Sequence, residues 1–327
     1  MTTFEKLIAD FPKQFNFEPR VENAERLPKA GSFVVGGMGG SHLAADLIKA
    51  TEPSLDLIIH KNYGSPILPT DTNLAEKLFV AVSYSGDTEE TLDFAEQALA
   101  KKLTLAVISK GGKLIAFAQK NNLPHIILPD TGLPPRMATG FVMTALLRLM
   151  GMENKIEELR MINFSAVADL PAGEASKKIA EVIGSRIPLF YASEQNEALA
   201  HYWKIIINET AKQPAFANVF PELNHNEMAS FANGNRISDF VFIFIKDEDD
   251  QPRIIKRMAV TKQILSELGG NISEINLTGA TRWEKIINSA ITAHWLAYYI
   301  ARAKNLDPLA TPMIEKFKKL MADNSGN

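Results

Sequence analysis

One stretch of the sequence joins an apolar strand, a hydroxyl-rich turn and a helix start with no spacer between them. Residues 78–82 read LFVAV, residues 83–88 read SYSGDT, and helix-forming sequence follows from residue 89. The first turn of a helix has unpaired backbone N–H groups and a partial positive charge, which suits a phosphate. The hydroxyls of Ser83, Ser85 and Thr88 add donors to such a site. For this loop alone, an ordinary helix cap with surface serines is the simpler interpretation.

A second loop of the same kind lies upstream. An apolar stretch at residues 31–35 leads into GGMGGS at residues 36–41, and helix-forming sequence follows. Glycines such as Gly39 and Gly40 let the backbone approach a ligand closely, and Ser41 lies where the helix begins. The dinucleotide-binding fingerprint lacks its third glycine here, and no Gly-Lys-Ser/Thr follows as in a Walker loop. The two strand–loop–helix segments therefore predict one anion-binding crevice at the carboxyl ends of parallel strands.

Short apolar segments alternate with helical segments along the first half of the chain. The expected strands are residues 33–35, 55–60, 78–82, 104–108 and 125–129, and the expected helices are residues 43–51, 88–101 and 112–120. This alternation is typical of α/β proteins with a parallel, doubly wound sheet. Residues 137–151 are a nearly uniformly apolar helical segment, which we expect to be buried.

The order of elements repeats in the second half of the chain. Residues 187–191 and 239–245 are expected strands, residues 196–212 an expected helix, and residues 272–279 resemble the earlier segment 104–111. The place of the serine loop is taken by the four carboxylates of residues 247–250, which would repel a phosphate. We therefore predict two doubly wound α/β domains from duplication, residues 1–153 and residues 154–327, of which only the first retains the anion site.

The composition limits the classes of partner. The chain has 327 residues, a net charge of -3 and a pI of about 6.1, so nucleic acid and anionic membranes are not expected as primary partners. No cysteine is present, which excludes disulfides and cysteine-ligated zinc and suits a cytoplasmic protein. The mixed, acidic beginning is unlike a signal peptide, and no run of residues has membrane-spanning character.

Five segments together carry a family resemblance. GGMGGS and SYSGDTEET resemble the sugar-isomerase (SIS) domain, and the double copy resembles phosphoglucose isomerases. NETAK at residues 208–212, PELNHNE at residues 221–227 and the tail DPLATPMIEKFK at residues 307–318 are similar to the bifunctional phosphoglucose/phosphomannose isomerases. His42 and Asp87 depart from the residues common in this family. We expect the Asp87 carboxylate to turn away from the phosphate and cap the helix.

The resemblance implies an aldose–ketose isomerase that opens a sugar ring and moves a proton through a cis-enediolate. It makes Glu209 the base, His225 the ring-opening acid and base, Arg136 the group that stabilises the enediolate, and Lys318 a group near the ring oxygen. It also implies a homodimer in which His225 reaches the neighbouring subunit's site. Taken without the resemblance, the same residues are a lysine-paired glutamate, a loop histidine, a surface arginine and a solvated lysine.

The remaining assignments concern the substrate. The resemblance gives phosphate binding to Gly39, Gly40, Ser41, Ser83, Ser85 and Thr88. It gives tolerance of both glucose and mannose 6-phosphates to Thr311, which otherwise is a helix cap before Pro312. No cofactor is expected, and the six histidines show no metal-ligand spacing.

Three other functions stay open at this point. The first is an isomerase confined to glucose 6-phosphate, and the second is an amino-sugar isomerase. The third is a non-catalytic SIS protein that senses a sugar phosphate, although no basic DNA-binding segment accompanies the pattern. For the isomerase we expect a place in glycolysis and gluconeogenesis.

Overall fold

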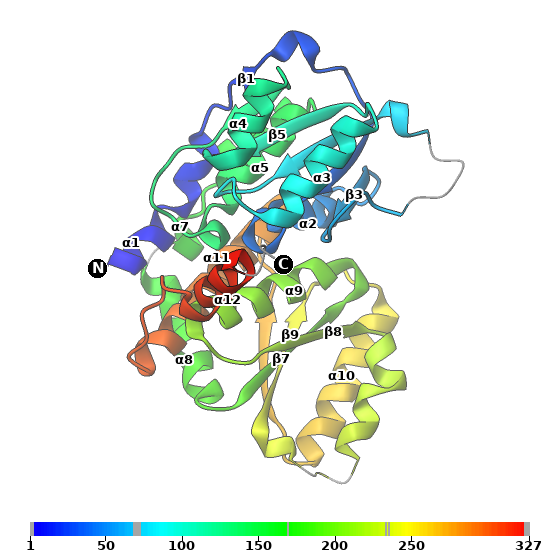
Figure 1. Cartoon of the computed structure of the whole chain (residues 1–327). Helices are drawn as coiled ribbons and strands as arrows, with labels where there is room; N and C mark the ends of the chain where they lie inside the picture. The colour runs from blue at the N-terminus through cyan, green and yellow to red at the C-terminus, as the bar shows by residue number, and fades with distance from the viewer. Residues whose placement is uncertain (1–2, 68–72, 169, 233, 235, 324–327) are drawn as a thin grey trace. The chain divides into compact units, whose positions relative to one another are not determined.

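The computed structural model describes residues 3–67, 73–168, 170–232, 234 and 236–323. The chain divides into two compact units. Residues 10–164 and 280–286 form the first, called the N-terminal unit below, and residues 1–9, 165–279 and 287–327 form the second, called the C-terminal unit. Each unit is built around one sheet (Figure 1).

The sheet of the N-terminal unit has six strands in the order β1-β6-β5-β4-β2-β3. Their bounds are β1 Val21–Glu22, β2 Ser32–Gly36, β3 Asp56–His60, β4 Lys77–Val82, β5 Leu105–Ser109 and β6 His125–Ile127. All neighbouring pairs are parallel except β1, which pairs antiparallel with β6 at the edge. β2 and β4 are direct neighbours, so the two predicted loops leave the same edge of the sheet from adjacent strands.

Helices cover both faces of this sheet. On one face lie α3 (Glu89–Ala100) and α4 (Gly112–Lys120), as Figure 1 shows. Their apolar side chains are buried against β4 and β5. On the other face, α2 (Leu43–Thr51) packs against α5 (Thr139–Leu149), and α6 (Glu153–Met161) follows. Nearly every residue of α5 is buried, which confirms the expectation for this apolar helix.

The sheet of the C-terminal unit has four parallel strands in the order β10-β9-β7-β8. Their bounds are β7 Ile187–Ser193, β8 Phe216–Phe220, β9 Phe240–Lys246 and β10 Asn271–Asn276. The helices of the unit are α1 Thr3–Ala9, α7 Ser165–Ala168, α8 Leu170–Ile183, α9 Glu197–Ile206, α10 Pro252–Glu267, α11 Arg282–Ala303 and α12 Pro312–Asp323, of which α11 also contributes its first residues to the N-terminal unit.

The C-terminal sheet is likewise covered on both faces. α10 closes one side through Met258 and Leu265, which join the aromatic cluster of the strands. On the other side, the ring of Trp203 in α9 packs against the ring of Phe190 in β7, with 5.6 Å between the ring centroids. The Trp203 indole N–H donates a hydrogen bond to the Ser289 hydroxyl of α11. Two doubly wound α/β sheets with the same order of elements confirm the predicted fold class.

Some elements differ from the expectation. Strand β8 was not predicted, because its first four residues are exposed or half-buried and form no apolar run. The predicted helix 196–212 ends early, and Ile207–Ala211 is a π-helical turn. The domains 1–153 and 154–327 stay a prediction, because compactness does not show that either segment folds alone.

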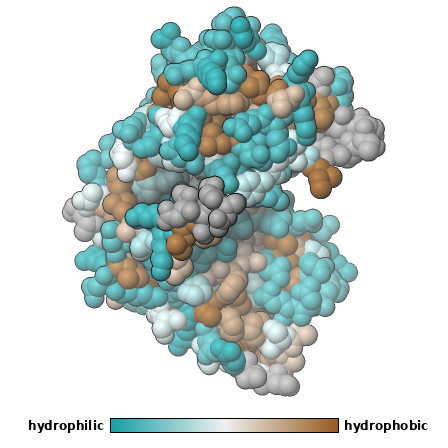
Figure 2. All heavy atoms as spheres, in the orientation of Figure 1, coloured by the Kyte–Doolittle hydropathy of each residue, from teal (hydrophilic) through white to brown (hydrophobic). Residues whose placement is uncertain are grey.

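The part of the chain that the structure describes has no helix of membrane-spanning character. No helix there is both long enough and apolar enough to cross a bilayer. Figure 2 shows one face of the molecule, on which hydrophilic residues predominate.

Candidate active site

A hydrogen bond links two loops of the N-terminal unit, residues 36–41, called the glycine loop, and residues 83–88, called the serine loop. The backbone N–H of Tyr84 donates to the Ser41 hydroxyl oxygen over 3.0 Å. Ser41 lies in the short 3-10 helix Gly39–Ser41 directly before α2, and its side chain is buried. The hydroxyl accepts this bond and keeps its own proton to donate.

The hydroxyls of the serine loop point at one another. The Ser83 and Thr88 hydroxyl oxygens are 2.9 Å apart, and the Gly86 N–H donates to Ser83 over 3.1 Å. The Asp87 N–H donates to Ser85 over 3.4 Å. Each hydroxyl oxygen therefore accepts or exchanges a bond within the loop, while at least one O–H of the group remains to donate to a ligand.

Thr88 stands at the N-cap of α3 but makes no side-chain capping hydrogen bond. The ordinary-cap interpretation of this loop is therefore wrong for Thr88, because its hydroxyl bonds to Ser83 instead. The helix start keeps backbone N–H groups without a cap, and the nearby Thr91 hydroxyl is buried without a partner. An anion supplies acceptors to such donors.

Gly86 fixes the path of the serine loop. Its φ is +84°, and a Cβ there would lie 1.8 Å from the carbonyl oxygen of Gly111. Asp87 follows with its carboxylate accepting the backbone N–H of Lys113 over 3.1 Å. Its carboxylate therefore caps the first turn of α4, rather than α3, the helix that directly follows the loop. We attribute this to the close packing of the serine loop against Gly111, which directly precedes α4.

The glycine loop also meets Arg136. A Cβ on Gly40 would lie 2.5 Å from the backbone nitrogen of Arg136, so only glycine fits at this approach. Arg136 lies in the 3-10 helix Pro135–Met137 and is 1% exposed. The surface-charge interpretation of Arg136 is therefore wrong. The Arg136 backbone lies beside the glycine loop, and its buried guanidinium provides positive charge in surroundings of low dielectric.

His42, one of the departures from the family pattern, turns to Asp46 in the next turn of α2. Its Nδ1 lies 2.6 Å from the Asp46 carboxylate, which also pairs with Lys61 at 3.1 Å. Burial by itself raises the pKa of Asp46. The hydrogen bond and the charge of His42, with the charge of Lys61, outweigh burial and hold that pKa below its ordinary value.

The equivalent strand ends of the C-terminal sheet hold a buried polar cluster. Asn196, fully buried, donates to Ser193 over 3.0 Å and lies near Asp247 and Asp250. Gln195 donates to Asp250 over 2.7 Å. Burial is the main reason that the pKa of Asp250 lies above its ordinary value. The polar side chains at this edge bond to one another. An anion placed here would meet the buried carboxyl groups of Asp247 and Asp250.

Glu209 lies in the π-helical turn Ile207–Ala211, half-buried at the end of α9. A π turn shifts the side chains that follow it and is frequent at functional sites. Lys212 comes next with φ +50°, and its ammonium group donates to the backbone carbonyls of Thr210 and Asp307. The turn is thereby tied to the segment that precedes Thr311.

The His225 side chain is exposed to solvent, while the residues next to it are hydrogen-bonded. It ends the 3-10 helix Glu222–His225, is exposed, and makes no side-chain hydrogen bond to the residues described. Asn226 caps the next 3-10 helix, and Asn224 bonds to α10. Glu227 accepts from the hydroxyl of Tyr191 over 2.5 Å. The fixed neighbours leave the imidazole free to reach a substrate.

Glu227 holds together elements next to His225, an arrangement that the sequence analysis does not predict. Besides the bond from Tyr191, it accepts a hydrogen bond from the Asn218 side-chain amide over 2.5 Å. It thereby joins β7 and β8 to residues 221–227, called the histidine loop below. Burial, followed by the charge of Glu227, raises the pKa of Tyr191 and keeps its hydroxyl a donor. The signal available in the sequence was the dense polar run PELNHNE.

Thr311 precedes α12, and Lys318 lies exposed within it. The Thr311 hydroxyl makes no hydrogen bond within the described part of the chain, while its carbonyl accepts the Glu315 N–H over 3.1 Å. A capping role for the Thr311 side chain is therefore not observed. The geometry leaves this hydroxyl available to another group.

The structure thus gathers Gly40, Ser41, Ser83, Thr88 and Arg136 in the N-terminal unit. Gly39 and Ser85 lie on the same two loops of this unit. Glu209, His225, Thr311 and Lys318 belong to the C-terminal unit, on the π turn, the histidine loop and the tail. Among the described residues, no group of three or more His, Asp or Glu side chains is arranged to hold a metal ion.

Comparison with known proteins gives relatives over nearly the whole chain. Residues 173–321 match the bacterial phospho-glucose isomerase C-terminal SIS domain. The bifunctional phosphoglucose/phosphomannose isomerase of Thermoplasma acidophilum is 31% identical over 94% of this chain and 95% of the relative. The enzyme of that name from Thermoplasma volcanium is 30% identical over 93% of this chain and 95% of its own.

A solved structure agrees at the level of the fold. A hypothetical protein from Thermus thermophilus superposes with a TM-score of 0.74 at 17% identity, covering 99% of this chain and 90% of that one. The sequence relatives decide the family, since each is at least 30% identical and the match covers at least 93% of this chain. The chain belongs to the family of bifunctional phosphoglucose/phosphomannose isomerases.

Proposed function

We propose that this protein is an aldose–ketose isomerase that interconverts glucose 6-phosphate and mannose 6-phosphate with fructose 6-phosphate. The observation that carries the proposal is the gathering of Ser41, Ser83 and Thr88 at one sheet edge, in a chain of this family. Hydroxyls beside an uncapped helix start bind a phosphate monoester without any metal.

The phosphate of the substrate binds between the two loops. Of the Ser83 and Thr88 hydroxyls, the one that does not donate to the other donates its proton to the phosphate. Ser85 and the backbone at Gly39 and Gly40 complete the contacts, and the helix start of α3 adds its N–H groups. Because the phosphate does not react, these contacts are equal in the ground state and the transition state and lower KM.

The proton transfer is assigned to Glu209. After ring opening, its carboxylate takes the proton from C2, the electron pair forms the C1–C2 double bond of a cis-enediolate, and the same proton returns to C1. Arg136, buried and positively charged, stabilises the enediolate oxygen. Lys318 acts at the ring oxygen together with His225, which moves the proton that opens the ring.

We assign His225 to the site of a neighbouring subunit in a homodimer. Its exposed imidazole, held out by bonded neighbours, supports this assignment. Mixed dimers of Glu209→Gln and His225→Ala subunits test it, because one of the two sites then holds both intact residues. Recovery of activity after subunit exchange supports the shared site, and inactivity despite verified exchange contradicts it.

The function is tested by a coupled assay of the purified protein on glucose, mannose and glucosamine 6-phosphates. Turnover of the first two, with proton exchange at C2, is expected. Turnover of glucose 6-phosphate alone would make the protein a single-substrate isomerase. Binding without any turnover would leave a sugar-phosphate sensor, the non-catalytic alternative.

We further propose that the enzyme acts in the cytoplasm, in glycolysis and gluconeogenesis. The absence of cysteine from the chain suits a reducing compartment. Cell fractionation followed by the same assay on each fraction locates the activity.

A further inference from the structure

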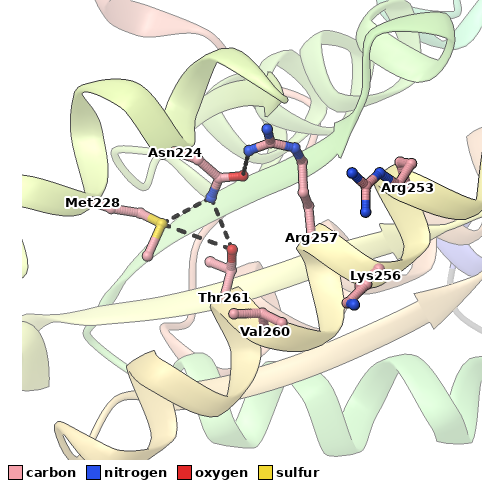
Figure 3. A pocket seen from close by; sticks show the side chains of 7 residues that line it. All are labelled: Asn224, Met228, Arg253, Lys256, Arg257, Val260 and Thr261. Atoms are coloured by element: carbon pink, nitrogen blue, oxygen red, sulfur yellow. Dashed lines mark hydrogen bonds between the residues drawn. The ribbon is translucent and has the colours of Figure 1, made fainter.

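A pocket of about 440 Å³ lies in the C-terminal unit. One wall is α10, and the other is the histidine loop and the short 3-10 helix Glu227–Phe231. Figure 3 shows its side chains, which are Asn224, Met228, Arg253, Lys256, Arg257, Val260 and Thr261. A volume of this size fits a small metabolite rather than a bare ion.

The lining is positive and contains no carboxylate. Arg253, Lys256 and Arg257 come from consecutive turns of one side of α10. None of the three is in an ion pair with any residue that the structure describes. Lys262 on the same helix differs, since it pairs with Glu274 at 2.9 Å. Three like charges on one wall repel one another unless an anion joins them.

The floor of the pocket is fixed by hydrogen bonds. The Asn224 side chain accepts from Arg257 over 3.2 Å and donates to Thr261 over 2.9 Å, as Figure 3 shows. Thr261 is 2% exposed, and Met228 packs beside it. Arg257 is thereby held by a neutral partner, and its remaining N–H groups stay available for a ligand.

We propose that this pocket is a second anion site, separate from the glycine and serine loops, for a small phosphorylated molecule with at least two negative charges. Two guanidinium groups and an ammonium match the several acceptor oxygens of a phosphate. Val260 and Met228 provide apolar contact for the rest of the molecule. The proposal does not depend on turnover, because no step of the isomerase reaction is assigned to a residue that lines the pocket.

The test is isothermal titration calorimetry of the whole protein with inorganic phosphate and with pyrophosphate. A Ser83→Ala/Thr88→Ala background weakens the loop site, so that binding at the pocket is seen separately. On that background, Arg253→Gln/Arg257→Gln is expected to weaken pyrophosphate binding by about tenfold or more. The matched control is Lys178→Gln, which removes an exposed charge on α8 of the same unit.

The outcomes separate this site from the catalytic one. Equal pyrophosphate affinity in the pocket variant and the Lys178→Gln control overturns the proposal. Citrate binding as tightly as pyrophosphate also overturns the assignment to a phosphorylated ligand. If the pocket variant changes the sedimentation coefficient but not anion binding, the cations face a second copy of the chain instead, and the proposal is wrong. None of these results depends on turnover.

Discussion

The two sheets have the same strand–loop–helix arrangement at the carboxyl ends of their strands. They differ in the side chains that lie there. After β2 and β4 in the N-terminal unit, glycines and hydroxyls leave donors at the sheet edge, and the Ser83 hydroxyl bonds to the Thr88 hydroxyl and the Gly86 N–H. After β7 and β9 in the C-terminal unit, Asn196 and Asp250 bond within a buried cluster. A strand–loop–helix frame therefore does not by itself make an anion site. The side chains at the strand ends decide whether the edge receives a ligand or closes on itself.

The second difference is where chemistry is placed. The N-terminal unit carries the proposed phosphate-binding groups and Arg136, whereas the C-terminal unit carries Glu209 on a π turn and His225 on an exposed loop, the two residues proposed to move protons. We interpret this as a division between phosphate binding and proton transfer. Such a division makes the effects on kcat and KM separable.

Glu209→Gln is the strongest test of that division. It keeps the shape of the side chain but removes the base, so kcat is expected to fall by about two to four powers of ten. Exchange of the C2 proton with solvent falls with it, while the affinity for a substrate analogue is retained. A variant that keeps turnover within a few-fold of the parent shows that Glu209 is not the base.

Ser83→Ala in the N-terminal unit is expected to raise KM for both sugar phosphates by about tenfold, since one hydrogen bond to a charged group is lost. The kcat should change much less, because the phosphate contact is uniform. Ser193→Ala, at the end of β7 in the other sheet, is the matched control and should leave KM unchanged. Inorganic phosphate should compete with substrate in the parent. Equal effects of the two substitutions would contradict the comparison.

Thr311→Gln tests the breadth of the substrate. Glucose and mannose 6-phosphates differ at C2, so Glu209 serves both only if the C2–C3 bond rotates within the site. Added bulk at residue 311 is expected to lower kcat/KM for mannose 6-phosphate roughly tenfold more than for glucose 6-phosphate. Thr311→Ser is the control. If both activities fall in proportion, the residue is structural.

The two units should also respond oppositely to pH. Asp46 has a lowered pKa, so its stabilising contribution is present above the unfolded pKa and is lost as the pH falls through the folded value. Asp250 has a raised pKa, so the stability linked to its protonation is present at low pH and is lost as the pH rises through the folded value.

Thermal unfolding of two variants measures this difference. Relative to the parent, Asp46→Asn should be destabilised more at about pH 7 than at about pH 3. Asp250→Asn should gain stability over the same rise, because an amide avoids burying a charge. The same pH trend in both variants would show that Asp46 and Asp250 have electrostatically similar surroundings.

Local sequence determined the frame of this protein. Strands such as residues 78–82 are apolar runs bounded by turn residues, and the helices that follow have amphipathic or apolar periodicity. The loops were predicted because glycine and hydroxyl residues lie directly at helix starts. These signals act between residues a few positions apart, so they can be read from the chain alone.

Tertiary structure decided which of these residues meet. The Thr88 hydroxyl turned from its helix to Ser83, and Asp87 capped α4 because Gly86 brings Gly111 close. Arg136 became buried because Gly40, far earlier in the chain, lets its backbone approach.

The same holds for the elements that local signals missed. β8 forms on pairing with β7 although its own residues are half exposed, and the basic pocket joins α10 to Asn224 of the histidine loop. Each of these contacts links residues far apart in sequence. Their free energy arises from packing and from satisfying buried polar groups, so no local pattern encodes it.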